Sequence, residues 1–128
     1  MRVLLDTHAF LWWIADSGRL SVAARQVIAD EANDIAVSAA SAWEIATKYR
    51  IGKLPGAEPV ALDVARAISA QGFGHLPISV GDAERAGRLP GPHRDPFDRM
   101  LAAQALARDL AVVSADAALD AYGIRRIW

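Results

Sequence analysis

The chain has 128 residues, of which 53% are hydrophobic and 23% are charged, a composition that excludes a disordered or collagen-like protein. It contains no cysteine, so disulfide frameworks, thiolate zinc sites and cysteine nucleophiles are excluded as well. Fourteen basic and fifteen acidic residues give a net charge of −1, without the basic excess that is typical of nucleic-acid-binding domains.

Short apolar runs predict five strands, and segments with helical spacing or helix-start signals separate them. The expected strands are Arg2–Leu5, Ile35–Ser38, His75–Ile78, Leu110–Ser114 and Arg125–Trp128. The expected helices are Thr7–Ala15, Val22–Ala32, Ala39–Tyr49, Pro59–Ala70, Val80–Gly87 and Pro96–Arg108, with a short one near Ala117. This alternation predicts a single α/β domain over residues 1–128, in which helices cover both faces of a central parallel sheet.

The longest apolar stretches are interrupted well before the roughly 18 residues that a membrane-spanning helix needs. Only three apolar residues separate Arg2 from Asp6, which is too few for the apolar core of a secretory signal. We therefore expect a soluble, cytoplasmic protein.

Five acidic residues lie near the expected strand ends. Asp6 directly follows the first strand, and Asp116 lies just after the fourth. Asp95 and Asp98 open the helix that precedes the fourth strand, and Glu44 lies in the helix after the second. Because ligands of parallel sheets bind at the carboxyl ends of the strands, these acids are candidates for one shared site.

Local structure offers a second explanation for each acid taken singly. Asp6, Asp95 and Asp116 stand where helix N-caps are expected. Glu44 and Lys48 have the i, i+4 spacing of an ordinary exposed ion pair. In combination, however, several carboxylates a few ångströms apart need a positive charge among them, and Mg²⁺ or Mn²⁺ is the natural ion for oxygen ligands. Such an ion supports phosphodiester hydrolysis.

Four segments, in order along the chain, resemble the PIN-domain ribonucleases that serve as toxins in VapBC toxin–antitoxin pairs. They are VLLDTHAFLW at 3–12, SAWEI at 41–45 with the following Lys48 and Gly52-Lys53-Leu54, HRDPFDRMLAAQA at 93–105, and VVSAD at 112–116. The resemblance implies a PIN-like fold and an endoribonuclease that depends on Mg²⁺ or Mn²⁺. Asp6, Glu44 and Asp98 match the family's metal-coordinating acids, and Asp116 matches a fourth position. Asp95 either joins the metal ligands or only caps its helix.

The resemblance also implies an RNA substrate, a homodimer, and an antitoxin that fills a groove near the site, in a heterotetramer or larger assembly. Trp12 or Trp13 is expected to line that groove, unless both pack internally. Trp43 is expected in the core. Arg94 and Arg99 flank the acids and are expected to contact RNA phosphates, or else to be solvated surface residues.

Two other classes of protein compete with this interpretation. A receiver-like phosphotransfer domain needs a second acid beside Asp6 and a late lysine, but Thr7 follows Asp6 and both lysines precede residue 54. A non-catalytic PIN-like binding module, whose acids only cap helices, differs from a nuclease in binding no metal. The histidines at positions 8, 75 and 93 lack the spacing of zinc ligands and receive no role in the site.

Overall fold

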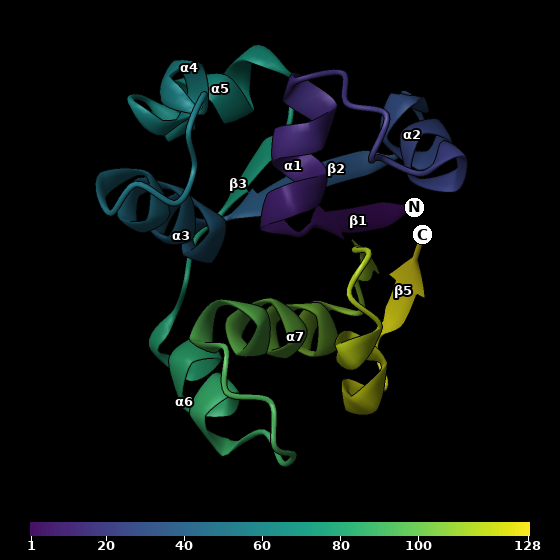
Figure 1. Cartoon of the computed structure of the whole chain (residues 1–128). Coiled ribbons are helices and arrows are strands. Elements are labelled where there is room, and N and C mark those ends of the chain that lie inside the picture. The colour runs from purple at the N-terminus through teal and green to yellow at the C-terminus, as the bar shows by residue number, and fades with distance from the viewer.

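The computed structural model describes all residues from 1 to 128 and contains one parallel sheet flanked by helices (Figure 1). The strands are β1 (Arg2–Leu5), β2 (Asp34–Ser38), β3 (Gly74–Leu76), β4 (Ala111–Val113) and β5 (Arg125–Ile127). The helices are α1 (Thr7–Ile14), α2 (Val22–Ala29), α3 (Ala39–Arg50), α4 (Glu58–Ala61), α5 (Val64–Ala70), α6 (Val80–Arg88) and α7 (Pro96–Arg108), followed by a short 3₁₀ helix, η1 (Ala117–Tyr122). The sheet order is β3-β2-β1-β4-β5 with every pair parallel, which confirms the expected fold class.

The expectation of one continuous helix over Pro59–Ala70 is wrong, because the chain breaks at Asp63. This residue leaves the helical region at φ −155° and ψ 80°, and its carboxylate accepts a hydrogen bond from the backbone N–H of Arg66. Aspartate favours N-caps over helix interiors because its short side chain competes for backbone N–H groups. The segment therefore forms two short helices, α4 and α5.

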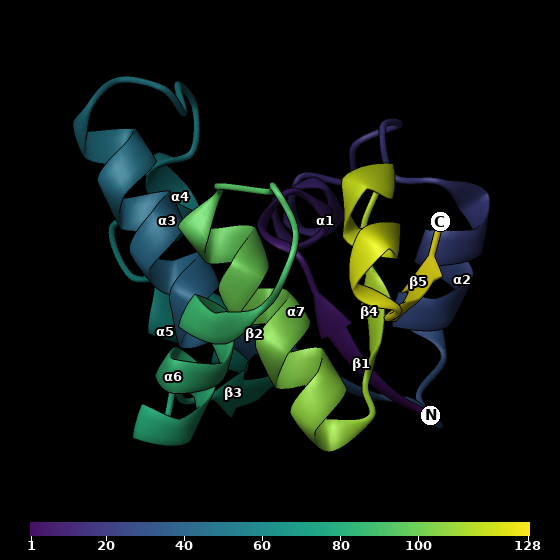
Figure 2. The ribbon, with the colours of Figure 1, turned by 90° about the horizontal axis from the view of Figure 1, so that it is seen from below.

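The core lies in two parts, one on each face of the sheet. Along β1, Val3 and Leu5 point to the face covered by α1, α2, α4 and α5, whereas Leu4 points to the face covered by α7 and η1. Figure 1 shows the sheet between these two groups of helices, and Figure 2 looks onto the face that α7 covers. Complete burial of a side chain such as Phe10 contributes about 1.5–3 kcal/mol relative to its exposure.

A buried polar network joins α6 to α7. Arg108 donates to both carboxylate oxygens of Asp82 at 2.9 and 3.0 Å, and Gln104 donates to Asp82 Oδ2 at 3.2 Å. Asp82 also closes a capping box with Ser79 at the start of α6. The hydrogen bonds from Arg108 hold the pKa of Asp82 well below its usual range, although burial acts in the opposite direction. This network fixes α7, whose first turn carries two of the candidate acids.

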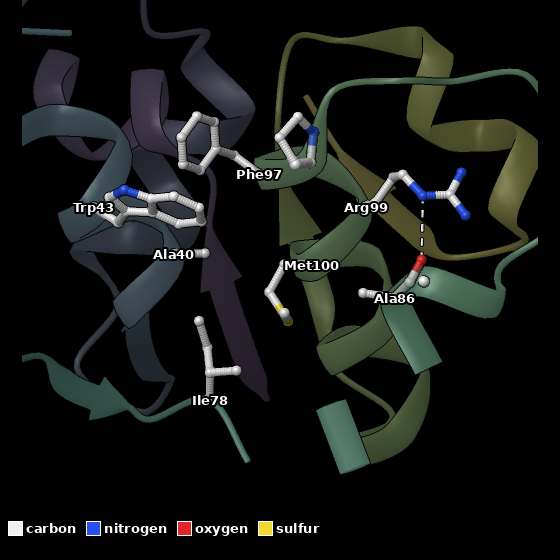
Figure 3. Close-up of a pocket in the computed structure, with 9 residues that line it drawn as sticks. Ala40, Trp43, Ile78, Ala86, Phe97, Arg99 and Met100 are labelled. Carbon is white, nitrogen blue, oxygen red and sulfur yellow. Dashed lines mark hydrogen bonds between the residues drawn. The ribbon is translucent and has the colours of Figure 1, made fainter. Parts of the chain in front are cut away.

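Trp43 is 61% exposed, so the expectation that it belongs to the core is wrong. Its indole packs edge-on against Phe97, with ring centroids 4.9 Å apart. The two rings lie at one end of an apolar groove between α3, α6 and α7, which Ile78 and Met100 also line (Figure 3). Helix α3 therefore turns Trp43 away from the sheet even though the neighbouring Glu44 is buried.

The carboxyl ends of all five strands meet at one edge of the sheet. Helices α1 and α3 begin there, directly after β1 and β2. Helix α7 runs back across the sheet before β4, so its first turn lies at the same edge. None of the helices combines the length and the apolar character that crossing a membrane requires.

Candidate metal centre

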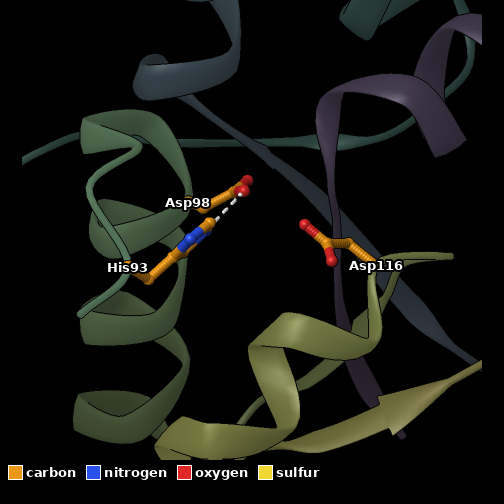
Figure 4. Close-up of side chains that lie close together, drawn as sticks. All are labelled: His93, Asp98 and Asp116. Carbon is orange, nitrogen blue, oxygen red and sulfur yellow. Dashed lines mark hydrogen bonds and ion pairs between the residues drawn. The ribbon is translucent and has the colours of Figure 1, made fainter. Parts of the chain in front are cut away.

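Three side chains from separate segments converge at this edge of the sheet. Asp98 comes from the first turn of α7, Asp116 follows β4, and His93 precedes α7 (Figure 4). One donor atom from each lies within 4.8 Å of the other two, and His93 Nε2 is 3.0 Å from Asp98 Oδ2. Two of the expected metal ligands are thus brought together, with a histidine that sequence spacing did not identify.

A second pair of acids is buried beside the start of α1. Asp6 is 7% exposed and Glu44 is 5% exposed. Thr7, the residue after Asp6, donates its hydroxyl to Glu44 Oε1 at 2.6 Å and lies 3.0 Å from Ser41 Oγ. Thr7 therefore orients the Glu44 carboxylate relative to the segment that carries Asp6.

Lys48 connects the two groups of acids electrostatically. Its ammonium forms an ion pair with Glu44. Burial acts to lower the pKa of Lys48, but the hydrogen bond and charge of Glu44, together with the charges of Asp95 and Asp98, raise it overall. The i, i+4 pair is therefore not an ordinary exposed one, because its carboxylate is buried and its ammonium faces the other acids.

Ser114 provides a second connection, through hydrogen bonding. Its hydroxyl accepts the backbone N–H of Asp116 at 3.0 Å and also interacts with Asp6. Burial raises the pKa of Asp6, and the charge of Glu44 adds to this effect, whereas the hydrogen bonds from Ser114 and from the backbone N–H of Ala9 oppose it. Asp6 is therefore linked through Ser114 to the segment that carries Asp116.

The carboxyl group of Asp98 is the most perturbed in the cluster. Burial raises its pKa to about 6, the hydrogen bond from His93 opposes the rise, and the charges of Asp95 and Asp116 reinforce it. Strongly shifted carboxyl groups gathered at one place are typical of functional sites. A bound cation would favour the ionised form of each of these acids.

The expected helix caps are also present. Asp6, Asp95 and Asp116 each accept a backbone N–H through Oδ1, at 2.8, 2.9 and 2.9 Å, and so begin α1, α7 and η1. Glu44 and Asp98 cap no helix. Capping and clustering coincide because these helices begin at the edge of the sheet where the strands end.

The donor set fits a hard divalent cation. Carboxylate oxygens are the ligands that Mg²⁺ and Mn²⁺ prefer in proteins, and Mn²⁺ also accepts an imidazole nitrogen. Asp98, Asp116 and His93 offer three donor atoms within 4.8 Å of one another, and the buried Asp6 and Glu44 lie at the same edge of the sheet, so the residues present fit such an ion. The structure reveals three further members of the site, His93, Lys48 and Thr7. The sequence signals for them were the positions of Thr7 and His93 within the matched segments 3–12 and 93–105 and, for Lys48, its i, i+4 spacing from Glu44.

The two arginines beside the acids differ in their contacts. Arg94 is exposed and forms neither a hydrogen bond nor an ion pair. Arg99 donates to the backbone carbonyl groups of Ala86 at 3.1 Å, of His93 at 2.9 Å, and of Leu89. The guanidinium of Arg99 therefore holds the loop before α7. This role differs from the contact with RNA phosphates that was expected for Arg99.

The adjacent tryptophans of α1 face different sides of their helix, as expected. Trp12 packs on Trp128, with ring centroids 5.8 Å apart, and lines a groove between α1 and the segment 53–60. Trp13 donates its indole N–H to Gln71 at 3.0 Å and packs against Phe73. Both side chains are half-buried, and Trp12 alone borders the groove that begins at His8, near the acids.

A parallel sheet of this order with clustered acids at its carboxyl edge defines a class of protein, the PIN domain. Residues 3–124 match the PIN domain family model, and the chain belongs to this family.

The chain is also similar to individual members of this family. Over 121 residues the chain is 33% identical to ribonuclease VapC22 of Mycobacterium tuberculosis, an alignment that covers 94% of this chain and 91% of VapC22. A shorter match, 47% identical over 64 residues, links it to ribonuclease VapC16 of the same organism and covers 50% of this chain and 44% of VapC16. The solved structure of VapBC-5 from Mycobacterium tuberculosis, a member of the VapBC family of toxin–antitoxin systems, shares the fold with a TM-score of 0.64 and 19% identity, over 98% of this chain and 96% of that one. The resemblance seen in the motifs is thereby confirmed.

Proposed function

We propose that this PIN domain is a metal-dependent endoribonuclease that acts in the cytoplasm as the toxin of a type II toxin–antitoxin pair. The observation that carries the proposal is that Asp98 and Asp116 lie close together at the edge of the sheet where the buried acids Asp6 and Glu44 also lie. The relatives VapC16 and VapC22, both named ribonucleases, support the choice of RNA as substrate.

In this proposal Asp6, Glu44 and Asp98 hold Mg²⁺ or Mn²⁺, with Asp116 and Asp95 beside them. The bound cation supplies a Lewis acid for hydrolysis of a phosphodiester. The chain itself keeps the carboxylates in place. Capping hydrogen bonds fix three of them, the Thr7 hydroxyl orients Glu44, and the His93 imidazole contacts Asp98. This arrangement lets the acids stay where mutual repulsion would otherwise separate them.

Arg94 is the side chain that we assign to the RNA backbone. Its guanidinium is exposed, has no partner within the protein, and precedes the acids Asp95 and Asp98 by one and four residues. Guanidinium groups bind phosphates in a forked geometry. The acids account for much of the negative charge of the chain: without the five clustered ones, ten acidic residues stand against fourteen basic ones. A cation in the cluster would leave the rest of the surface able to attract a polyanion.

The alternative, a binding module whose acids only cap helices, explains three of the acids and leaves two unexplained. Glu44 and Asp98 begin no helix, and Glu44 is almost fully buried. Burying a carboxyl group costs free energy unless partners compensate it, and Glu44 has the Thr7 hydroxyl and the Lys48 ammonium. Asp98 instead lies with His93 and Asp116, with one donor atom of each within 4.8 Å of the others, an arrangement that helix capping does not require. The geometry therefore favours a metal-binding nuclease.

The first test is cleavage of total cellular RNA by the purified chain in the presence of Mg²⁺, Mn²⁺ or excess EDTA, with the cut ends mapped by sequencing. We expect defined cuts with either metal and none with EDTA, since hydrolysis depends on the bound cation. DNA of matched length serves as the control substrate and should stay intact. Cleavage that persists in EDTA, or no cleavage with either metal, would contradict the proposal.

We propose further that the groove between α1 and the segment 53–60 receives a segment of the antitoxin. Its volume is about 580 Å³, and its walls include Trp12, Leu54 and Val60, with Arg19 and Lys53 at its margin. The groove also includes His8, two residues after Asp6, so an occupant would reach the edge of the site. An extended segment with apolar and acidic side chains matches these walls.

Substitution of the two adjacent tryptophans tests this assignment. Trp12→Ala should weaken binding of the antitoxin at least about tenfold, because aromatic anchors in grooves dominate interface energies. Trp13→Ala, its matched control, lies on α1 outside this groove and should leave the affinity nearly unchanged. Binding is measured by calorimetry with the product of the adjacent reading frame. Equal effects of the two variants, or a product that does not bind, would contradict the assignment.

We propose last that the chain forms a homodimer and that this dimer combines with the antitoxin in a heterotetramer or larger complex. The exposed Trp43 and its partner Phe97 support it, because a large exposed apolar patch marks an interaction surface. Light scattering of the purified chain, alone and with antitoxin, measures the number of copies in each assembly.

A further inference from the structure

His93 is the one member of the cluster for which the proposed function has no role. Its side chain points toward Asp98 and Asp116, and the three come from different segments (Figure 4). Its Nε2 is 3.0 Å from Asp98 Oδ2, and the donor atoms of all three residues lie within 4.8 Å of one another. Ligands bound at about 2.1 Å to one ion are at most about 4.2 Å apart, so small side-chain adjustments would place all three on a single ion.

The backbone of His93 is held in place by the helix that carries Asp98. Arg99, the next residue of α7, donates to the carbonyl oxygen of His93 at 2.9 Å and also to that of Leu89. The imidazole therefore lies on a loop that is fastened to the same helix as one of the acids. Fixing the supporting backbone is how proteins keep a ligand in a productive position.

Tyr122 offers the second group that a metal-binding histidine needs. Its hydroxyl is buried and has no hydrogen-bond partner, and its ring centroid is 6.2 Å from that of His93. Histidine ligands almost always donate their other ring N–H to an acceptor, and a tyrosine hydroxyl can accept. The unpaired hydroxyl of this neighbouring tyrosine is therefore an available acceptor for the Nδ1–H of His93 when Nε2 binds a metal, after a movement of either ring.

We propose that His93 is a nitrogen ligand of the metal centre, together with Asp98 and Asp116, and that it makes the centre prefer Mn²⁺ to Mg²⁺. This inference rests on the proposed function, because it concerns the same centre. Imidazole is a good ligand for transition-metal ions such as Mn²⁺, whereas Mg²⁺ binds oxygen and keeps much of its water. One nitrogen ligand therefore shifts the relative affinity for the two ions.

The test is binding of Mn²⁺ alone and of Mg²⁺ alone to the full chain, without RNA. Calorimetry compares the wild type with His93→Gln and with the control His75→Gln, whose imidazole bonds to Ser69 instead. For His93→Gln we expect the Mn²⁺ Kd to rise at least about tenfold and the Mg²⁺ Kd to change less than about threefold. His75→Gln should match the wild type for both ions.

Pulsed EPR of the Mn²⁺-loaded wild type supplies an independent readout that needs no variant. With ¹⁵N-labelled histidine, a histidine nitrogen should be coupled to the ion, and His93→Gln should lose this coupling. Mn²⁺ binding without any histidine coupling, or with the same Kd ratio in His93→Gln, would overturn the role of His93 while leaving the metal centre intact. Failure of the wild type to bind Mn²⁺, or unchanged binding by Asp98→Asn, would overturn the metal centre itself.

Discussion

Asp6→Asn should reduce RNA cleavage at least about a hundredfold while the chain stays folded, because it removes the charge of one proposed metal ligand. Asparagine caps helices as well as aspartate does, so the hydrogen bond that begins α1 is retained. Burial raises the pKa of the Asp6 carboxyl group, so a neutral amide in its place adds no cost of desolvation. The cleavage rate is measured at saturating metal and compared with the thermal midpoint of unfolding.

Asp63→Asn is the matched control for this experiment. Asp63 also caps a helix, with its Oδ1 accepting an N–H at 3.0 Å, but it starts α5 and belongs to none of the groups at the metal centre. Its replacement should leave both cleavage and stability nearly unchanged. A folded Asp6→Asn protein that cleaved RNA as fast as the wild type would remove Asp6 from the catalytic site.

The second large effect concerns stability and involves the ion pair between α6 and α7. Arg108→Met should lower the free energy of unfolding at pH 7 by about 3 kcal/mol, because it leaves the buried Asp82 carboxylate without its cation. Arg108 is partly exposed, and Gln104 still donates to Asp82, so the lower end of the range for buried pairs applies. The measurement is urea unfolding followed by circular dichroism.

Acid should reduce this difference between the variant and the wild type. The pKa of Asp82 is depressed in the folded protein, so its contribution is complete above the unfolded value of about 3.9 and is lost as the pH falls further. The difference in stability should therefore begin to shrink below about pH 4 and keep shrinking as the pH approaches the depressed pKa of folded Asp82. The control is Arg88→Met, which removes the exposed pair with Glu84 on α6, the helix of Asp82, and should cost about 0.5 kcal/mol or less. A difference that grew in acid would contradict the assignment.

Local sequence was sufficient for much of the fold and for the identity of the acids. Apolar runs marked the inner strands β1, β2 and β4, because a strand that is covered on both faces of a parallel sheet is largely apolar along its length. The segment Asp95-Pro96-Phe97-Asp98 indicated the start of α7 because capping involves residues only a few positions apart. Acids that directly follow parallel strands were expected at one edge, since those strands all end there.

The rest of the site required the packing of elements that are distant in the chain. His93 and Asp116 lie close together only because α7 crosses the sheet before β4. The spacing of residues in the sequence does not predict that crossing. Arg99 was expected to contact RNA, but the carbonyl groups that its guanidinium meets are provided by the fold around it. Trp43 was expected in the core because tryptophan is large and apolar, yet the rotation of α3 that buries Glu44 turns the preceding side chain outward. Residue type and short-range spacing set backbone conformation and capping, whereas the partners of a side chain depend on which helix faces come together.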